Sequence, residues 1–266
     1  MAYFLGPRAR PHFKLTGIYN SARPKIYNTI KEYGIIIRET GLFGLIKGDG
    51  VRIGVVACDI MKRELEKILP SVPEVSEVVW LEAALHCKPK YMKEVIKENI
   101  NAIKDKVDVI FLGYGYCQSL KDIEAEFDIP IVMPQMDDCI QILMTPETYS
   151  KEIKKEVGTW FMTPGWAEVG VEMVIKENHL DRVVKYGKDP VEMAKRLFTH
   201  YKRGLYIDTG VGNDEFFIGK SQEFCEVFKL KLEKMEAAST ILEEHLEQCK
   251  ALGSNAETLV GGPVKG

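Results

Sequence analysis

The sequence of 266 residues contains no long apolar segment, either at its start or elsewhere. No stretch approaches the roughly 18 to 20 consecutive apolar residues that a bilayer-spanning helix needs. The first residues combine proline, arginine and aromatic side chains, which is unlike the apolar core of a secretory signal peptide. We therefore expect a cytoplasmic protein with no membrane partner.

Neither sign of charge predominates. The chain carries 36 lysines and arginines against 39 aspartates and glutamates, a formal net charge of -3. This balance gives no general attraction to phosphate backbones, so we expect no nucleic-acid partner. Hydrophobic residues make up 45% of the chain, which is enough for one large or two small globular domains.

Two familiar binding motifs are also missing. The segment GlyTyrGlyTyrCys at 113–117 lacks the third glycine of a dinucleotide-binding turn, and no phosphate-loop lysine follows it. The cysteines do not form paired Cys-x-x-Cys knuckles. A nucleotide cofactor is therefore disfavoured, and a metal site would have to be assembled from residues far apart in the chain.

Short apolar strands alternate with helical patterns from residue 53 onward. The pattern predicts strands at 53–57, 77–81, 107–112, 129–133, 159–163, 182–185 and 205–209. The helical segments between them, such as 59–69 and 90–103, are long enough for right-handed crossovers between parallel strands. We therefore predict an α/β fold, with a doubly wound, mainly parallel, Rossmann-like sheet and helices on both of its faces.

The ends of the chain fall outside this alternation. Residues 1–50 are predicted to form an N-terminal arm and a helix, the helix from Lys25 to about Leu45. Residues 51–215 form the α/β domain expected to hold a metal site. Residues 216–266 are predicted to form a long amphipathic C-terminal helix, interrupted near residues 237–240, and a flexible tail.

Four of the six cysteines come directly after predicted strands: Cys58, Cys87, Cys117 and Cys139. The carboxyl ends of parallel strands are where open α/β sheets build their sites. In a reducing compartment such thiols are better candidates for ligands, nucleophiles or small core residues than for disulfides. Their shared placement indicates a metal site.

A histidine completes a candidate ligand set. His86, Cys117 and Cys139 together suit zinc with an open fourth position, although iron takes the same ligands. Cys58 or Cys87 as a further ligand would close the site. Amides at the start of the following helix would lower the thiol pKa of Cys58, but a small buried cysteine in a strand-to-helix turn explains that position equally well.

Two residues near these candidates have potential catalytic roles. Asp138 either caps the helix that follows it or orients a metal ligand such as His86 through a hydrogen bond. Trp166, in ThrProGlyTrp at 163–166, either stacks on a flat ligand or packs against the end of the sheet.

Glycines mark two turns where a cofactor would lie against the backbone. Gly113 and Gly115 follow an apolar strand and let the chain turn sharply and approach a ligand closely. Asp208 and Gly210 end another strand, in a loop whose backbone amides can bind phosphate or carboxylate.

Several short motifs carry a resemblance to a known family. They are ValAlaCysAsp at 56–59, LeuHisCysLysPro at 85–89, GlyTyrGlyTyrCys at 113–117, ProGlnMetAspAspCys at 134–139, ThrProGlyTrp at 163–166 and TyrIleAspThrGly at 206–210. This set resembles domain-of-unknown-function family 1638 of methanogenic archaea and anaerobic bacteria, over roughly residues 52 to 215. The family pattern matches His86, Cys117, Asp138 and Cys139, but Gln135 stands where the family pattern leads us to expect arginine.

The resemblance implies a place in one-carbon metabolism, because genes of this family often accompany corrinoid-dependent methyltransferase systems. Two functions follow. In the first, the chain is a zinc methyltransferase whose metal activates a thiol or another methyl acceptor for attack on a methyl-corrinoid. In the second, it is a non-catalytic accessory or assembly subunit with an iron-sulfur cluster or a structural metal. Both imply a corrinoid protein or methyltransferase subunit as partner, which supplies the corrinoid, and both imply an oligomer or complex subunit.

Overall fold

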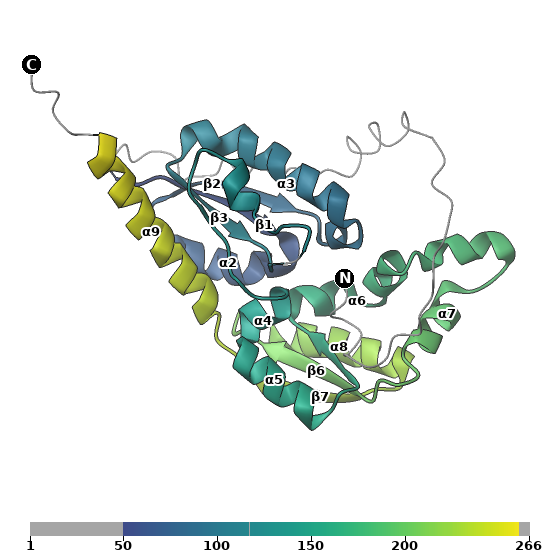
Figure 1. The fold of residues 1–266 in the computed structure, drawn as a ribbon. Helices are drawn as coiled ribbons and strands as arrows, with labels where there is room; N and C mark the ends of the chain where they lie inside the picture. The colour runs from purple at the N-terminus through teal and green to yellow at the C-terminus, as the bar shows by residue number, and fades with distance from the viewer. Residues whose placement is uncertain (1–49, 117, 261–266) are drawn as a thin grey trace, which may run out of the picture.

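The structure, a computed structural model, describes residues 50–116 and 118–260. The predicted N-terminal helix and Cys117 therefore lie outside the described residues. The strands of the described part form two parallel sheets, one of four strands and one of three, and each sheet is the centre of its own lobe (Figure 1). The predicted α/β class with a doubly wound parallel sheet is confirmed, and the described part also contains a second parallel sheet that the sequence did not predict.

The first sheet has the order β2-β1-β3-β4. Its strands are β1 (Ile53–Cys58), β2 (Val75–Leu81), β3 (Val109–Gly113) and β4 (Ile131–Val132), and all neighbours are parallel. Every residue of β1 and β3 is buried, as expected for central strands covered on both faces. The order reverses between β1 and β3, which makes the crevice beyond their carboxyl ends the usual ligand position in such a sheet.

Helices cover both faces of the first sheet. In Figure 1, α2 (Lys62–Ile68) lies on one face and α3 (Pro89–Ile103) on the other, so this sheet is doubly wound as predicted. The helix α3 buries Met92, Ile96, Ile100 and Ile103, spaced three to four residues apart. Short 3-10 turns complete the connections: η1 (Asp59–Met61), η2 (Leu69–Ser71), η3 (Ala83–Cys87), η4 (Lys104–Lys106) and η5 (Ile123–Glu126).

The second sheet has the order β5-β6-β7, again parallel. Its strands are β5 (Thr159–Met162), β6 (Arg203–Asp208) and β7 (Lys231–Glu236). The remaining elements up to β7 are α4 (Cys139–Met144), α5 (Pro146–Lys155), α6 (Pro164–Glu177), η6 (Leu180–Tyr186), α7 (Pro190–Leu197) and α8 (Asp214–Phe228). Aromatic rings from β5, α8 and the end of α7 form much of this lobe's core, and Phe198 and Phe228 stack with their centroids 3.9 Å apart.

Two sequence-based predictions in this lobe are wrong. Residues 182–185 lie in the 3-10 helix η6 rather than in a strand. The predicted long helix from 216 onward is broken by β7, because Lys229 adopts a left-handed conformation (φ 57°) that ends α8. In β7 the apolar residues Leu232 and Met235 are three apart, which mimics a helical period in a charged edge strand. The structure thus divides the chain differently from the predicted segments 51–215 and 216–266.

The last helix, α9 (Thr240–Val260), returns to the first lobe and packs on β1, β3, β4 and α4 (Figure 1). It buries Ile241, Leu242, Leu246 and Cys249. Among the described helices, α9 included, we find none that is long and apolar enough to cross a membrane.

Helix α6 of the second lobe docks against α2 and η1 of the first. A Cβ atom on Gly165 would lie 2.2 Å from the carbonyl oxygen of Ile60, so only glycine permits this approach. Arg63 on α2 pairs with Glu168 on α6, with Nη2 and Oε2 2.7 Å apart. These contacts place the second half of α6 beside the turns that follow the first sheet.

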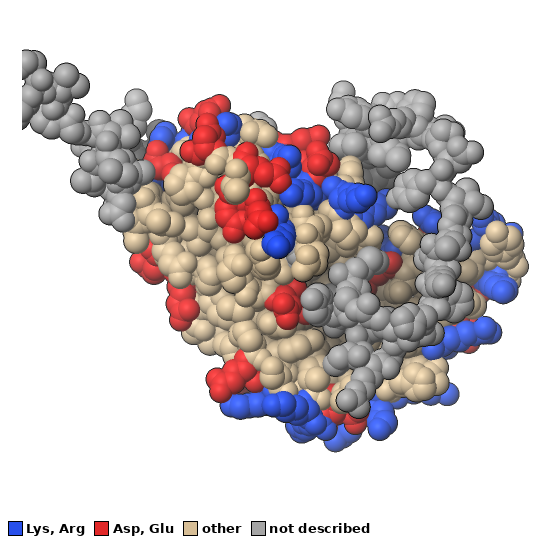
Figure 2. All heavy atoms as spheres, in the orientation of Figure 1, with Lys and Arg blue, Asp and Glu red and all other residues tan. Residues whose placement is uncertain are grey.

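The outer edge of the second lobe carries charges of both signs, which lie side by side near α5 in Figure 2. Arg203 at the start of β6 is 4% exposed, and its Nη1 lies 2.6 Å from Oε2 of Glu152 and 3.2 Å from Oε2 of Glu233. Its Nε also donates to Thr159 Oγ1 at 2.9 Å. This buried guanidinium ties β5, β6, β7 and α5 together.

Candidate metal centre

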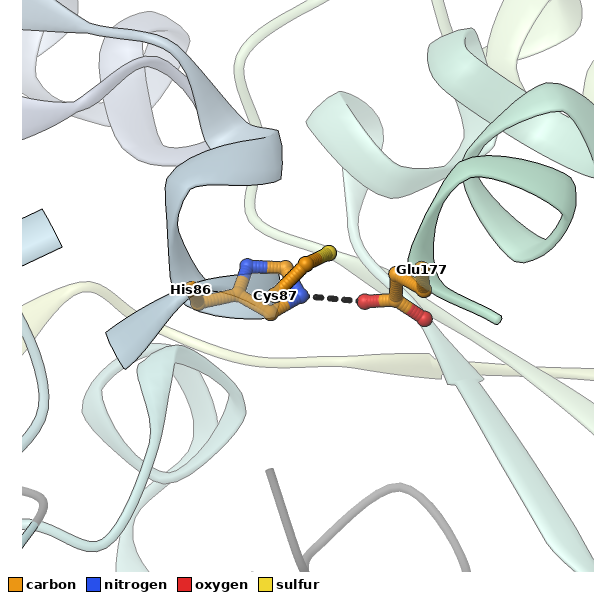
Figure 3. Close-up of side chains that lie close together, drawn as sticks. All are labelled: His86, Cys87 and Glu177. Atoms are coloured by element: carbon orange, nitrogen blue, oxygen red, sulfur yellow. Dashed lines mark hydrogen bonds and ion pairs between the residues drawn. The ribbon is translucent and has the colours of Figure 1, made fainter. Parts of the chain in front are cut away.

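Three potential metal ligands from the two lobes meet between them. His86 and Cys87 end the turn η3 after β2, and Glu177 is the last residue of α6. One ligand atom from each lies within 4.8 Å of the others. Figure 3 shows the imidazole of His86 and the carboxylate of Glu177 facing each other, with a hydrogen bond from Nε2 to Oε1.

The group is largely shielded from solvent. The side chain of His86 is 25% exposed, that of Glu177 is 8% exposed, and Cys87 is buried. Burial alone would lower the pKa of His86, but hydrogen bonds with Cys87 and Glu177 outweigh it and raise the pKa to about 9. The carboxylate therefore stabilises a positive charge at this position, which a metal cation would also provide.

A break in α6 accompanies the placement of Glu177. Gly170 has φ 52° and ψ -139°, a conformation that non-glycine residues rarely adopt. The first half of the helix begins at the N-cap Thr163, whose side chain accepts from the backbone N–H of Trp166, and docks on the first lobe. The second half leaves at a different angle and ends at Glu177.

Two more cysteines lie at the ends of strands of the first sheet or in the turns that follow them. Cys58 ends β1, and Cys139 is the first residue of α4. The two thiols interact electrostatically, and the negative charge of Glu177 also raises the pKa of the Cys139 thiol. Burial raises the pKa of Cys58 well above 9.0, helped by the charge of Asp59. A hydrogen bond from the backbone N–H of Ile60 lowers the pKa of Cys58, as expected, but desolvation outweighs it and the net shift is upward.

Burial also raises the pKa of Cys139, to about 12, and the negative charge of Asp138 adds to this effect. Both thiols are therefore protonated at neutral pH while no cation lies beside them. A metal ion would reverse this preference, because it stabilises the thiolate directly.

Trp166 connects the two parts of the site. It is buried, and its ring centroid lies 5.9 Å from that of His86 with the planes tilted by 55°. The neighbouring indole of Trp166 opposes the rise in the pKa of the Cys139 thiol. The indole therefore packs between the strand-end turns of the first lobe, while stacking on a flat ligand stays a prediction.

Asp138 is the N-cap of α4, with Oδ1 accepting from the backbone N–H of Gln141 at 2.9 Å. Of its two predicted roles, the structure thus provides the helix cap. The carboxylate that contacts His86 is that of Glu177. Burial raises the pKa of Asp138 to about 6, and the backbone N–H of Gln141 opposes this shift.

The two glycines after β3 are explained by contacts within the protein. A Cβ atom on Gly113 would lie 2.6 Å from Cβ of Ala57 on β1, and one on Gly115 would lie 2.7 Å from Cα of Asp138. The backbone N–H of Tyr116 donates to the carbonyl of Met136 at 2.6 Å. The turns after β1, β3 and β4 are therefore packed against one another, and a cofactor at Gly113 and Gly115 stays a prediction.

The loop at Asp208 and Gly210 is also engaged by the protein itself. Asp208 Oδ1 accepts from the N–H of Gly210 at 2.8 Å, and its Oδ2 pairs with Lys234 Nζ at 2.7 Å. Gly210 has φ 67°, which favours glycine, and its carbonyl accepts from Lys67 Nζ at 2.9 Å. Anion binding at this loop stays a prediction.

Of the predicted metal ligands, the structure brings His86, Cys58 and Cys139 to one side of the first sheet, and Cys117 lies outside the described residues. Glu177 was not predicted, because it is one of several acidic residues on a helix and only lobe packing singles it out. Its burial is the informative signal, since buried glutamates are rare unless paired.

The chemistry of the donor set fits a zinc ion. Zinc takes nitrogen, sulfur and carboxylate oxygen at about 2.0 to 2.3 Å, so tetrahedral ligands lie roughly 3.5 Å apart. Small side-chain adjustments would bring His86, Cys87 and Glu177 to that spacing, since their ligand atoms already lie within 4.8 Å. Three protein ligands would leave a fourth position open.

Two of the three comparisons with known proteins are uninformative. No curated protein matches the sequence. A crystal structure of the NocB thioesterase domain in covalent complex with a fluorophosphonate nocardicin G analog aligns with 80% of this chain and 96% of that chain. The sequence identity is 14% and the TM-score 0.20, too low to support any inference.

The family match is clear. The model of the family described as "Protein of unknown function (DUF1638)" matches residues 80–246. The matched span includes His86, Cys87, Cys139 and Glu177, and it confirms the resemblance found in the motifs. The chain belongs to this family of proteins of unknown function.

Proposed function

We propose that this chain is a metal-binding protein of corrinoid-dependent one-carbon metabolism, with zinc as the metal, that activates a thiol or another methyl acceptor for methyl transfer. The observation that carries the proposal is the approach of His86, Cys87 and Glu177 to within 4.8 Å of one another. Zinc in such a site lowers the pKa of a bound thiol without any change of redox state.

The protein's own residues supply the selectivity for zinc. The nitrogen, sulfur and oxygen ligands differ from the cysteine-rich sets that iron-sulfur clusters use. Two ligands come from the first lobe and one from the second, so binding a metal would also tie the lobes together. The thiols of Cys58 and Cys139 are not among the ligand atoms that lie within 4.8 Å of one another.

The metabolic context rests on the family resemblance. A corrinoid protein or methyltransferase subunit is the proposed partner, and it supplies the corrinoid. We further propose a cytoplasmic location, consistent with methanogenesis and related pathways, and assembly as an oligomer or complex subunit.

Metal analysis of the anaerobically purified protein tests the proposal. We expect zinc in equimolar amount and no brown colour. Glu177→Gln and Cys87→Ser should each weaken zinc binding by about a hundred-fold or more, since each removes one of few ligands. Glu168→Gln is the matched control on the same helix, because Glu168 pairs with Arg63 instead. Equal zinc affinity in Glu177→Gln and Glu168→Gln would refute the proposed site.

A second function is favoured by an apolar surface on the second lobe. Val184, Tyr186 and Leu197 are 60%, 71% and 37% exposed on the neighbouring elements η6 and α7. A contiguous surface of such groups is typical of a protein contact. In this alternative the chain is a non-catalytic accessory subunit with an iron-sulfur cluster or structural metal, held by Cys58, Cys87 and Cys139.

The two functions differ in measurable ways. A zinc methyltransferase should transfer a methyl group from a methyl-corrinoid to a thiol, and a His86→Ala variant should lose this activity. A brown protein with an iron-sulfur absorption spectrum, or a zinc protein that is inert in this assay, would favour the accessory function.

A further inference from the structure

Helices α6 and α8 of the second lobe pack against each other around an open cavity of about 520 Å³ (Figure 1). Small-molecule sites in proteins have volumes of roughly 300 to 1,000 Å³, so this cavity is large enough for a small ligand. Its lining on α6 comprises residues 167–173 and Lys176. On α8 the lining residues lie three and four positions apart, as on one face of a helix: Lys220, Glu223, Phe224 and Val227.

The cavity lies at the break in α6. Gly170 is part of the lining, and a Cβ atom there would meet nothing within 4 Å. A ligand can therefore approach the backbone closely at the break, because no side chain stands in its way. The lining includes residues on both sides of Gly170, so a bound ligand touches both halves of the helix.

Part of the lining is apolar. Ala167 and Met173 of α6 and Phe224 of α8 are buried, and Val169 and Val227 are half-buried beside them. An apolar wall of this kind binds an apolar group by removing it from water. The ligand should therefore have an apolar part.

The five charged residues of the lining differ in whether a partner already neutralises them. Glu168 pairs with an arginine of α2, and Lys220 pairs with Glu223 at 2.8 Å. Within residues 50–116 and 118–260, Glu172 and Lys176 form no ion pair with each other or with another side chain. They are four positions apart on α6, the spacing at which glutamate and lysine commonly pair. Both charges are therefore available to a ligand.

We propose that this cavity binds an apolar amino acid as a zwitterion, and that the bound amino acid is an effector of the candidate metal centre. Glu172 binds its ammonium group, Lys176 binds its carboxylate, and its side chain packs against Met173 and Phe224. A purely apolar ligand, or one with a single charge, would shield at least one of the two protein charges from water without replacing the lost hydrogen bonds. A zwitterion satisfies both.

The effector role follows from the course of α6. Lys176 directly precedes Glu177, the last residue of the helix. A ligand that contacts Ala167 before the break and Lys176 after it favours one angle between the two halves, and that angle sets the position of Glu177 relative to His86. The effector role rests on the proposed function, whereas the binding site itself does not.

Calorimetric titration of the full-length, metal-free protein tests the site. The ligands are L-phenylalanine, L-leucine, N-acetyl-L-phenylalanine, which lacks the ammonium charge, and L-phenylalaninamide, which lacks the carboxylate. We expect both amino acids to bind. Each of the two analogues should bind about ten- to a hundred-fold more weakly than L-phenylalanine, as for a lost hydrogen bond between charged groups.

Variants assign the two charges. Glu172→Gln should weaken L-phenylalanine binding by a similar factor and should no longer discriminate against the N-acetyl analogue. Lys176→Gln should do the same for the amide. Val227→Trp fills the cavity and should abolish binding. Glu215→Gln is the matched control, because Glu215 is an exposed residue of α8 outside the lining, and it should keep wild-type affinity.

Co(II) binding tests the effector role. Saturating L-phenylalanine should change the Co(II) affinity of the full-length protein by about 5- to 150-fold, and Co(II) should change the affinity for L-phenylalanine by the same factor. Glu172→Gln should remove this coupling. Co(II) affinity that L-phenylalanine leaves unchanged overturns the effector role.

The remaining outcomes concern the site itself. Binding of neither amino acid, equal affinity for L-phenylalanine and its two analogues, or an equal loss in Glu172→Gln and Glu215→Gln overturns the assignment of the cavity. A wild-type protein that binds no Co(II) or zinc overturns the proposed function and the effector role, while titration of the metal-free protein still decides whether the cavity binds an amino acid.

Discussion

The break at Gly170 gives a sharp test of how the fold positions the candidate metal centre. The change is Gly170→Ala. A Cβ atom there meets nothing within 4 Å, so the substitution acts only through the backbone, at φ 52° and ψ -139°. Holding alanine in this conformation costs about 1 to 3 kcal/mol. Alanine also restricts the unfolded chain, which returns roughly 0.4 to 1 kcal/mol and leaves a net loss of about 0.5 to 2 kcal/mol.

Gly219 provides the matched control. It lies inside α8, and a Cβ atom there also meets nothing within 4 Å. Because its backbone is helical, Gly219→Ala should stabilise the protein by about 0.5 to 1 kcal/mol. The same chemical change is thus expected to have opposite signs at two open positions.

Urea unfolding of the two variants measures this difference. Metal binding supplies a second measurement, because α6 can relieve the strain of the substituted residue by changing its bend and moving Glu177 away from His86. Relief of the full strain of about 1 to 3 kcal/mol in this way would weaken Co(II) binding by up to about 5- to 150-fold in Gly170→Ala, whereas Gly219→Ala should leave Co(II) affinity unchanged. A Gly170→Ala protein as stable as Gly219→Ala, with wild-type metal affinity, would refute the role of the break.

Two further predictions concern buried charges. Arg203→Met should destabilise the fold by about 2 to 4 kcal/mol, because it leaves Glu152 and Glu233 without their buried partner. Lys231 and Arg203 lower the pKa of Glu233 from 4.5 to about 2. The stability that Arg203→Met loses in urea unfolding should therefore shrink as pH falls from 4.5 to about 2. A stability loss that does not depend on pH would contradict this account. Burial raises the pKa of Glu64 above 4.5, so its contribution to stability is lost as pH rises. Glu64→Gln keeps an oxygen that accepts the hydrogen bond from Thr209. The variant should become increasingly stable relative to the wild type as pH rises from 4.5. A stability difference that stays constant with pH would argue against a raised pKa of Glu64.

The local pattern of the sequence predicted the strands that are buried on both faces. The apolar runs at β1, β3 and β6 are continuous because central parallel strands expose neither face to water. The charged edge strand β7 has no such run, and its apolar residues at 232 and 235 imitate a helix. Whether the strands form one sheet or two is not encoded in any local pattern, because it depends on which faces the helices cover.

The candidate site, like the fold, was predicted in part by the local sequence and in part decided by tertiary packing. Strand ends predicted that His86, Cys58 and Cys139 follow the same edge of the sheet, since every parallel strand of the first sheet ends there. Glu177 reaches His86 only because α6 crosses from the second lobe, docks through Gly165 and changes direction at Gly170. The sequence alone therefore determined which edge of the first sheet carries His86, Cys58 and Cys139. Only the packing of two lobes decided which carboxylate joins them, because that contact spans 91 residues of chain and depends on a helix bend.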